Sequence, residues 1–144
     1  MKEADPRMHS AEHLLTGVLV KMFGMGRPFT THLEKKKSKA DYRFNRLLTE
    51  EEAQHVESMV NEQINRDLAV SEEFLPREQA EGAFNLSRLP EDVRETVRII
   101  RIGDFDACPC AGTHVAMTKE IGLFRLISWS FEEDALRIRF RLEP

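Results

Sequence analysis

The stretch Cys110-Ala111-Gly112-Thr113-His114 places a thiol and an imidazole four residues apart, with a glycine between them. Gly112 permits a turn that would bring both side chains to one ion. A second pair lies far upstream, in His9-Ser10-Ala11-Glu12-His13. Histidines at this spacing share one face of a helix. Because imidazole and thiolate suit zinc, the two stretches predict one zinc ion. The predicted ligands are His9, His13, Cys110 and His114.

The neighbouring Cys108 leaves an alternative open. It could replace Cys110 as the thiolate, although the spacing from Cys110 to His114 is the one that encloses turn residues. Otherwise Cys108 is expected to be a loop residue that faces the core. Two cysteines one residue apart do not favour a disulfide, which indicates a reducing compartment. Residues 1–6 lack the apolar run of a signal peptide, and no stretch has the length of a membrane span. A cytoplasmic protein without membrane contact is therefore predicted.

The length of 144 residues predicts one domain covering residues 1–144. The net charge of −4 argues against a protein that is basic overall and binds nucleic acid with its whole surface. Residues 35–46 nevertheless hold six basic side chains and one acid. This local excess could meet phosphates, or it could be a solvated hairpin tip. The residues proposed for phosphate contact are Lys35, Lys36, Lys37 and Lys39.

The order of elements predicts an α+β fold with a largely antiparallel sheet and packed helices. Helices are expected from Asp5-Pro6 to about Phe23 and from the capping box at Thr49 to about Leu68. A short helix is expected to start over Pro76–Ala80 and to end at Gly82. Strands are expected at 29–33, 40–44, 69–75, 96–102, 121–131 and 136–143, the last two joined by a turn at 132–134. Residues 103–112 are expected to be a loop, and Pro90-Glu91-Asp92 a further one.

The upstream histidine pair also spells the HxxEH pattern of a class of zinc peptidases, with Glu12 as general base. Such a site needs a downstream carboxylate as its third ligand. This interpretation leaves Cys110 and His114 without a role, and 144 residues leave little room for a peptide-binding cleft. Outside that interpretation, Glu12 is expected to be a solvated glutamate on the helix surface.

Three motifs together resemble a known family. They are HSAEHLL at 9–15, CAGTHV at 110–115 and Thr118-Lys119-Glu120-Ile121-Gly122. They resemble the editing domain of alanyl-tRNA synthetases, and the size resembles the free-standing alanyl-tRNA editing proteins of the AlaX type. A related second additional domain occurs in threonyl-tRNA synthetases. The resemblance covers nearly the whole chain, including 75–80 and 97–103.

The resemblance implies a zinc-dependent hydrolase that removes the amino acid from mischarged tRNA(Ala), chiefly from seryl-tRNA(Ala) and secondarily from glycyl-tRNA(Ala). It places the zinc ligands on the four residues already named. It also places a threonine that recognises the serine hydroxyl on Thr30, with the adjacent Thr31 still a candidate. Ala111 stands where the family often has a glycine. A zinc-stabilised tRNA-binding module without catalysis is the alternative function.

Overall fold

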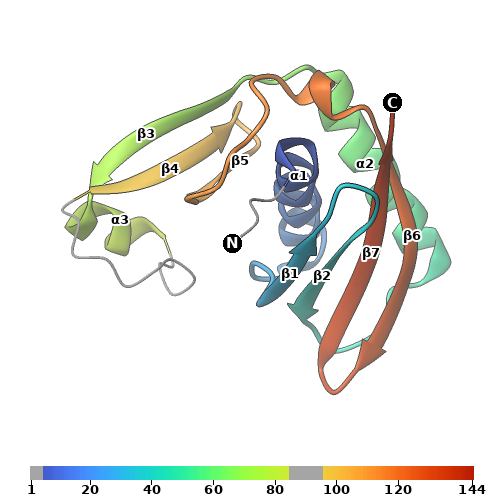
Figure 1. The fold of residues 1–144 in the computed structure, drawn as a ribbon. Coiled ribbons are helices and arrows are strands. Elements are labelled where there is room, and N and C mark those ends of the chain that lie inside the picture. Colours follow the sequence, from blue (N-terminus) through green and yellow to red (C-terminus); the bar gives the residue numbers. More distant parts are fainter. Residues whose placement is uncertain (1–4, 85–95) are drawn as a thin grey trace.

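The computed structural model describes residues 5–84 and 96–144, which form an α+β fold with two antiparallel sheets (Figure 1). The helices are α1 (Pro6–Phe23), α2 (Glu50–Asn65), α3 (Arg77–Ala83) and the short 3-10 helix η1 (Thr118–Ile121). The strands are β1 (Thr30–Leu33), β2 (Ser38–Arg43), β3 (Val70–Pro76), β4 (Thr96–Ile102), β5 (Asp106–Pro109), β6 (Leu123–Glu132) and β7 (Ala135–Glu143). One sheet has the order β1-β2-β7-β6 and the other β3-β4-β5. The predicted fold class is confirmed.

Helix α1 is the central element and lies between the two sheets (Figure 1). Asp5 caps its first turn by accepting hydrogen bonds from the backbone N–H groups of Arg7 and Met8, and Pro6 stands where no N–H is needed. The helix ends at Gly24, whose φ of 70° is easily reached only by glycine. Eleven of the twelve residues from Met8 to Leu19 are buried, so polar positions of this helix lie in the interior as well.

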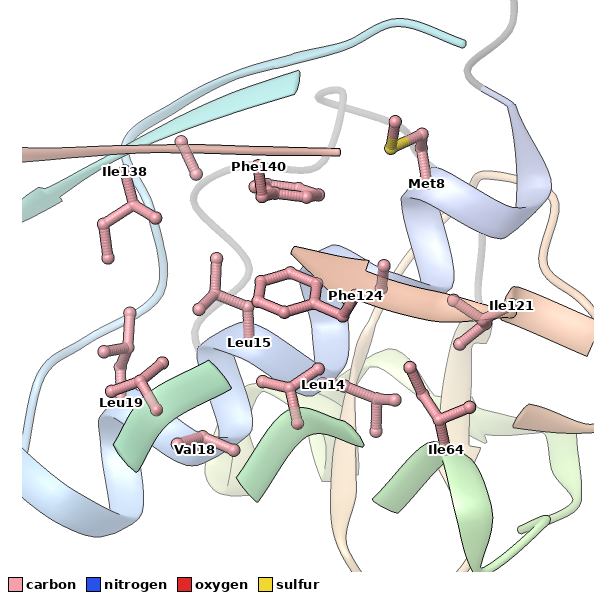
Figure 2. Packing of buried hydrophobic residues seen from close by; sticks show 14 of the residues in the cluster. Met8, Leu14, Leu15, Val18, Leu19, Ile64, Ile121, Phe124, Ile138 and Phe140 are labelled. Carbon is pink, nitrogen blue, oxygen red and sulfur yellow. The ribbon is translucent and has the colours of Figure 1, made fainter. Parts of the chain in front are cut away.

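The larger core forms between α1, α2 and the four-stranded sheet. Figure 2 shows side chains of α1, among them Leu14 and Leu15, facing Phe124 of β6 and Phe140 of β7. Strand β7 alternates between buried apolar residues and outward arginines, as its sequence predicts. The turn between β6 and β7 places Glu133 and Asp134 at positive φ. The outer edge of β6 is partly covered, because Asn61 and Glu57 of α2 bond to its backbone.

The smaller sheet has a separate apolar cluster of its own. Ala80 of α3 packs there with Val97 and Ile99 of β4, and half-buried side chains surround them. Strand β4 has the bounds that its β-branched sequence predicts. The contacts of α1 with β5 and η1 join this sheet to the larger core. Among the described helices, none is long and apolar enough to span a membrane.

Three predictions for local structure need correction. The expected loop at 103–112 contains strand β5, which pairs with β4 from Ile102↔Asp106 to Ile99↔Pro109. Its sequence, Asp-Ala-Cys-Pro, has neither apolar alternation nor β-branched residues, and Pro109 is tolerated because β5 is an edge strand. Helix α2 ends at Asn65 rather than near Leu68, and Ile121 belongs to η1 rather than to the following strand. The loop predicted at Pro90 lies outside the described residues.

Candidate metal centre

Two elements bring the four predicted ligands together. His9 and His13 lie on α1, and Cys110 and His114 lie on the segment that follows β5. One possible ligand atom from each of the four lies within 4.8 Å of all the others. The rings of His9 and His114 stack with centroids 4.2 Å apart, and His13 meets each of them edge to face. These side chains are therefore close enough to bind one metal ion.

The spacing of the donor atoms fits a tetrahedral ion. Sγ of Cys110 lies 3.3 Å from Nε2 of His9 and 3.4 Å from Nε2 of His114. Zinc bonds of about 2.3 Å to sulfur and about 2.0 Å to nitrogen, meeting at a tetrahedral angle, separate those atoms by about 3.5 Å. Three imidazoles and one thiolate also form a donor set that zinc accepts. The residues present therefore fit the metal that their types predict.

Hydrogen bonds hold the downstream ligands in place. Oγ of Ser10 lies 3.0 Å from Nδ1 of His114 and accepts the backbone N–H of Val115 at 3.2 Å. The guanidinium of Arg98 donates to the carbonyl oxygens of Cys110 at 3.1 Å and of Gly112 at 2.7 Å. Because Ser10 faces Nδ1 of His114, it favours Nε2 as the metal-binding nitrogen.

Gly112 allows His9 to approach the ligand loop. A Cβ atom built on Gly112 would lie within 3.0 Å of Cε1 and Nδ1 of His9, a distance that real Cβ atoms essentially never show. The absence of a side chain at Gly112 thus lets the His9 imidazole pack against the backbone, in addition to permitting the turn that the sequence predicts. Any side chain at this position would displace His9 or the loop.

Burial makes both downstream ligands neutral in the metal-free site. It raises the pKa of the Cys110 thiol above its ordinary value, although the N–H of Gly112 acts in the opposite direction. Burial also lowers the pKa of His114 to about 3, with smaller contributions from the charges of His9 and Arg98. Metal binding must therefore displace a proton from Cys110 and none from His114 near neutral pH.

We expect His114 to make the metal-free protein acid-sensitive. Its pKa is about 3 when folded and 6.5 ordinarily, so the unfolded chain binds more protons between these values. The free energy of unfolding should then fall as pH drops below 6.5, by up to about 1.4 kcal/mol per pH unit from this residue. Urea unfolding of the chelated protein at several pH values measures the slope. The variant His114→Asn should lose that component, and an unchanged slope would contradict the assignment.

A second polar group lies behind His13. Its Nδ1 is 3.4 Å from Sγ of Cys108 and 3.8 Å from Oδ2 of Asp106. Arg27 donates two hydrogen bonds to the Asp106 carboxylate, at 3.0 and 3.2 Å. Cys108 faces the interior as expected, but from strand β5 rather than from a loop. Burial raises the pKa of the Cys108 thiol strongly, so this cysteine is the more weakly acidic of the two.

The prediction of a solvated Glu12 is wrong. Glu12 is 5% exposed, and its Oε2 accepts a hydrogen bond from Thr16 at 2.7 Å. Thr16 in turn contacts the hydroxyl of Tyr42 at 2.8 Å, so the carboxylate belongs to a buried network between α1 and β2. Because both sheets pack on α1, the polar stripe of the helix is covered. Among the described residues, Glu12 is not part of either group of neighbouring ligand atoms, which weakens the peptidase interpretation.

The residues predicted to contact the substrate or phosphates lie on the β1–β2 hairpin and not on the segments that carry the metal ligands. Thr30 pairs with Asp41, and Thr31 with the fully buried Ala40. Because paired residues point to the same side of a sheet, Thr31 shares the side of Ala40 and Thr30 the other side. Lys35 to Lys37 are exposed at the hairpin tip, and Lys39 is half-buried on β2. The roles of these residues in binding remain predictions.

Sequence reasoning did not find Ser10, Arg27, Arg98 and Asp106. One signal was available, because Asp106, Cys108 and Cys110 alternate as they would on one face of a strand. That alternation is visible only if 106–110 is taken as extended chain. Ser10 and the two arginines have no such signal, since their roles depend on how α1, β4 and β5 pack together.

The downstream half of this site lies in a segment that matches a known protein family. The matched segment begins in β4 and ends in β7, and it contains Cys110 and His114. The upstream ligands and the threonine pair lie outside it. Residues 97–139 of this chain match the family described as the threonyl and alanyl tRNA synthetase second additional domain.

Proposed function

We propose that this protein is a zinc-dependent hydrolase that edits in trans, removing the wrong amino acid from mischarged tRNA(Ala) in the cytoplasm. Seryl-tRNA(Ala) is the chief substrate and glycyl-tRNA(Ala) the second. One observation carries the proposal: donor atoms from α1 and from the segment after β5 converge on one point. Two of those donors lie within the segment that matches the threonyl and alanyl tRNA synthetase second additional domain.

In this proposal His9, His13, Cys110 and His114 hold the zinc. A zinc ion bound there would supply Lewis-acid polarisation of the ester carbonyl or a water of lowered pKa. In the reaction, water adds to the ester carbonyl carbon, the bond to the ribose oxygen breaks, and the free amino acid and the uncharged tRNA leave. Ser10 orients the His114 ring, and Arg98 fixes the loop that carries Cys110. No described residue is assigned as a general base.

Discrimination against alanine requires a polar group that needs the serine hydroxyl. An apolar pocket discriminates poorly between substrates that differ by one hydroxyl. A pocket with a polar group discriminates better, because an alanyl ester would leave that buried group unpaired. The resemblance assigns this role to Thr30. The strand register makes Thr31 the threonine that shares the side of the sheet with Ala40 and Tyr42, which contacts α1. The variants Thr30→Val and Thr31→Val separate the two: the one that recognises the hydroxyl loses activity on the seryl ester.

One observation favours the non-catalytic alternative. Four protein ligands fill a tetrahedral zinc, and filled sites are usually structural, whereas catalytic sites keep one position open. A zinc-stabilised tRNA-binding module would bind tRNA, unfold when the metal is removed, and hydrolyse nothing.

Deacylation assays decide between these functions. Purified protein is incubated with seryl-tRNA(Ala) and, in parallel, with alanyl-tRNA(Ala), with and without a chelator. The editing function predicts loss of the seryl ester alone, and protection of that ester by the chelator. Survival of both esters with metal bound would overturn the proposal and leave the binding module. Loss of both esters would contradict the assigned specificity.

Two of the lysines proposed for phosphate contact, Lys37 and Lys39, line a hollow beside the sheet. Lys37, Lys39 and Arg139 line a hollow of about 270 Å³ with His32, Glu34 and Ser38. Lys39 pairs with His32 on one side and with Arg139 on the other, so the three cross the sheet in one row. Among the described residues, no carboxylate forms an ion pair with Lys39 or Arg139, and both charges are therefore available for phosphate.

We expect the double variant Lys39→Gln/Arg139→Gln to weaken tRNA binding about tenfold at low salt. The slope of log K against log salt concentration should become shallower by nearly two, because two phosphate contacts are lost. Filter binding at several salt concentrations measures both effects. The control is Arg125→Gln, which removes a cation of the same sheet that is already paired with Glu57 and Glu143. Equal losses in the two proteins would show that only net charge matters.

A further inference from the structure

Asp106 and Cys108 lie behind His13 and are not among the four predicted ligands. Asp106, Cys108 and His13 also offer ligand atoms that lie within 4.8 Å of one another. The Asp106 side chain is 8% exposed and that of His13 is 4% exposed, so both polar groups are buried. Burying a carboxylate is costly unless it is paired, and Asp106 is paired with Arg27.

The strand pairing fixes how this group faces α1. Asp106 is opposite Ile102, and Cys108 is opposite Ile100, in the register of β4 and β5. Residues two apart on a strand point to the same side, so Asp106 and Cys108 lie on one face of β5. Strand β4 holds that face in place through its hydrogen bonds, and His13 meets it from α1.

The surroundings of His13 favour a proton on Nδ1 and a lone pair on Nε2. A neutral imidazole carries a proton on one nitrogen and a lone pair on the other. Nδ1 faces the sulfur of Cys108 and the carboxylate of Asp106. A proton on Nδ1 is favoured there, because a carboxylate attracts it, and the lone pair is then on Nε2.

Arg27 makes a second metal ion unfavourable at this point. Its guanidinium already bonds both oxygens of Asp106, at 3.0 and 3.2 Å. A cation bound by Asp106, Cys108 and His13 would have to compete with this guanidinium for the oxygens and would be repelled by its charge.

From this geometry we infer that Asp106, clamped by Arg27 and assisted by Cys108, is a positioning residue that orients His13 and directs its Nε2 to the metal. A carboxylate behind a metal-binding histidine fixes the ring and strengthens it as a ligand. Ser10 orients His114 in the same way, but with an uncharged hydroxyl group. The inference rests on the proposed metal site and adds the group that determines how tightly His13 binds.

The test compares two aspartates in similar surroundings. Asp41 is also 8% exposed and bonds Arg137 twice, at 2.7 and 3.0 Å. It lies on β2 and, among the described residues, belongs to neither group of neighbouring ligand atoms. Zinc affinity is measured by competition with a chromogenic chelator, zinc content by elemental analysis, and the ligand field by the absorption of the cobalt-substituted protein. Circular dichroism of each metal-free variant confirms that it folds.

Asp106→Asn is expected to weaken zinc binding about 10- to 100-fold and to alter the cobalt spectrum, while Asp41→Asn changes neither. Asp106→Glu, which keeps the carboxylate, should recover part of the affinity. Unchanged affinity in Asp106→Asn, or an equal loss in Asp41→Asn, would overturn the inference. So would two ions per wild-type chain that fall to one in Asp106→Asn, since Asp106 would then be a ligand. A wild-type protein that binds no zinc would instead refute the proposed metal site.

Discussion

Replacing Cys110 with alanine should abolish both zinc binding and deacylation of seryl-tRNA(Ala). Cys110 is the one thiolate among the four donors, and its sulfur lies within 3.4 Å of nitrogens from both His9 and His114. Its loss leaves three imidazoles without the anionic ligand that offsets part of the ion's charge. We expect the affinity to fall by more than about 100-fold, which exceeds the usual effect of an outer-shell change. Elemental analysis and the deacylation assay measure the two losses.

The parallel variant Cys108→Ala separates the two cysteines. Cys108 contacts Nδ1 of His13 rather than the centre of the cluster, so its loss should weaken zinc binding without removing the metal. If Cys108→Ala lost the ion and Cys110→Ala kept it, the thiolate would be Cys108 and the ligand set would be wrong. Full metal content and full activity in Cys110→Ala would exclude Cys110 as a ligand.

Gly112→Ala should also weaken zinc binding, although it adds a single methyl group. That methyl group would overlap Cε1 and Nδ1 of His9. Either the imidazole leaves the cluster or the loop carrying Cys110 and His114 moves away, and both outcomes spoil the geometry of the ligands. We expect at least about a tenfold loss of zinc affinity, comparable to the loss of an outer-shell partner. Chelator competition measures the change.

Gly26→Ala is the matched control for this substitution. A Cβ at Gly26 would meet nothing within 4 Å, and its φ is not in the left-handed region. The methyl group should therefore be tolerated, and zinc affinity should remain that of the wild type. A Gly112→Ala protein that also kept wild-type affinity would show that His9 does not need its present position against the loop.

The sequence predicted the fold well wherever a hydrophobic period was strong. Strand β4 has its predicted bounds because Val97, Ile99 and Ile102 are apolar and β-branched and therefore favour a buried strand. Helix α1 was predicted from its cap and its apolar stripe. Strand β5 was missed, since its pairing comes from the neighbouring β4 and not from its own residues. Tertiary contact overrides local preference there.

The sequence identified the four side chains that the structure brings together, but not the residues that surround them. Cys110 and His114 form a motif whose residue types already suggest zinc, and the structure brings them to His9 and His13. The burial of Glu12 was not predicted, because a polar residue on an amphipathic helix is expected to face solvent. In the fold, α1 has a sheet on each side, and that arrangement depends on distant residues.

The arrangement of two apolar clusters on either side of α1 has a consequence for the order in which the chain becomes rigid. Cys110 and His9 are 101 residues apart, and the smaller cluster beneath β4 is separate from the larger one. An ion shared by α1 and the segment after β5 would act as a cross-link that closes a very long loop, worth up to about 4.7 kcal/mol in the chain-entropy account of such links. Hydrogen exchange should then slow mainly in β3, β4 and β5 when zinc is added, because the ion fastens the smaller sheet to a body that is already folded.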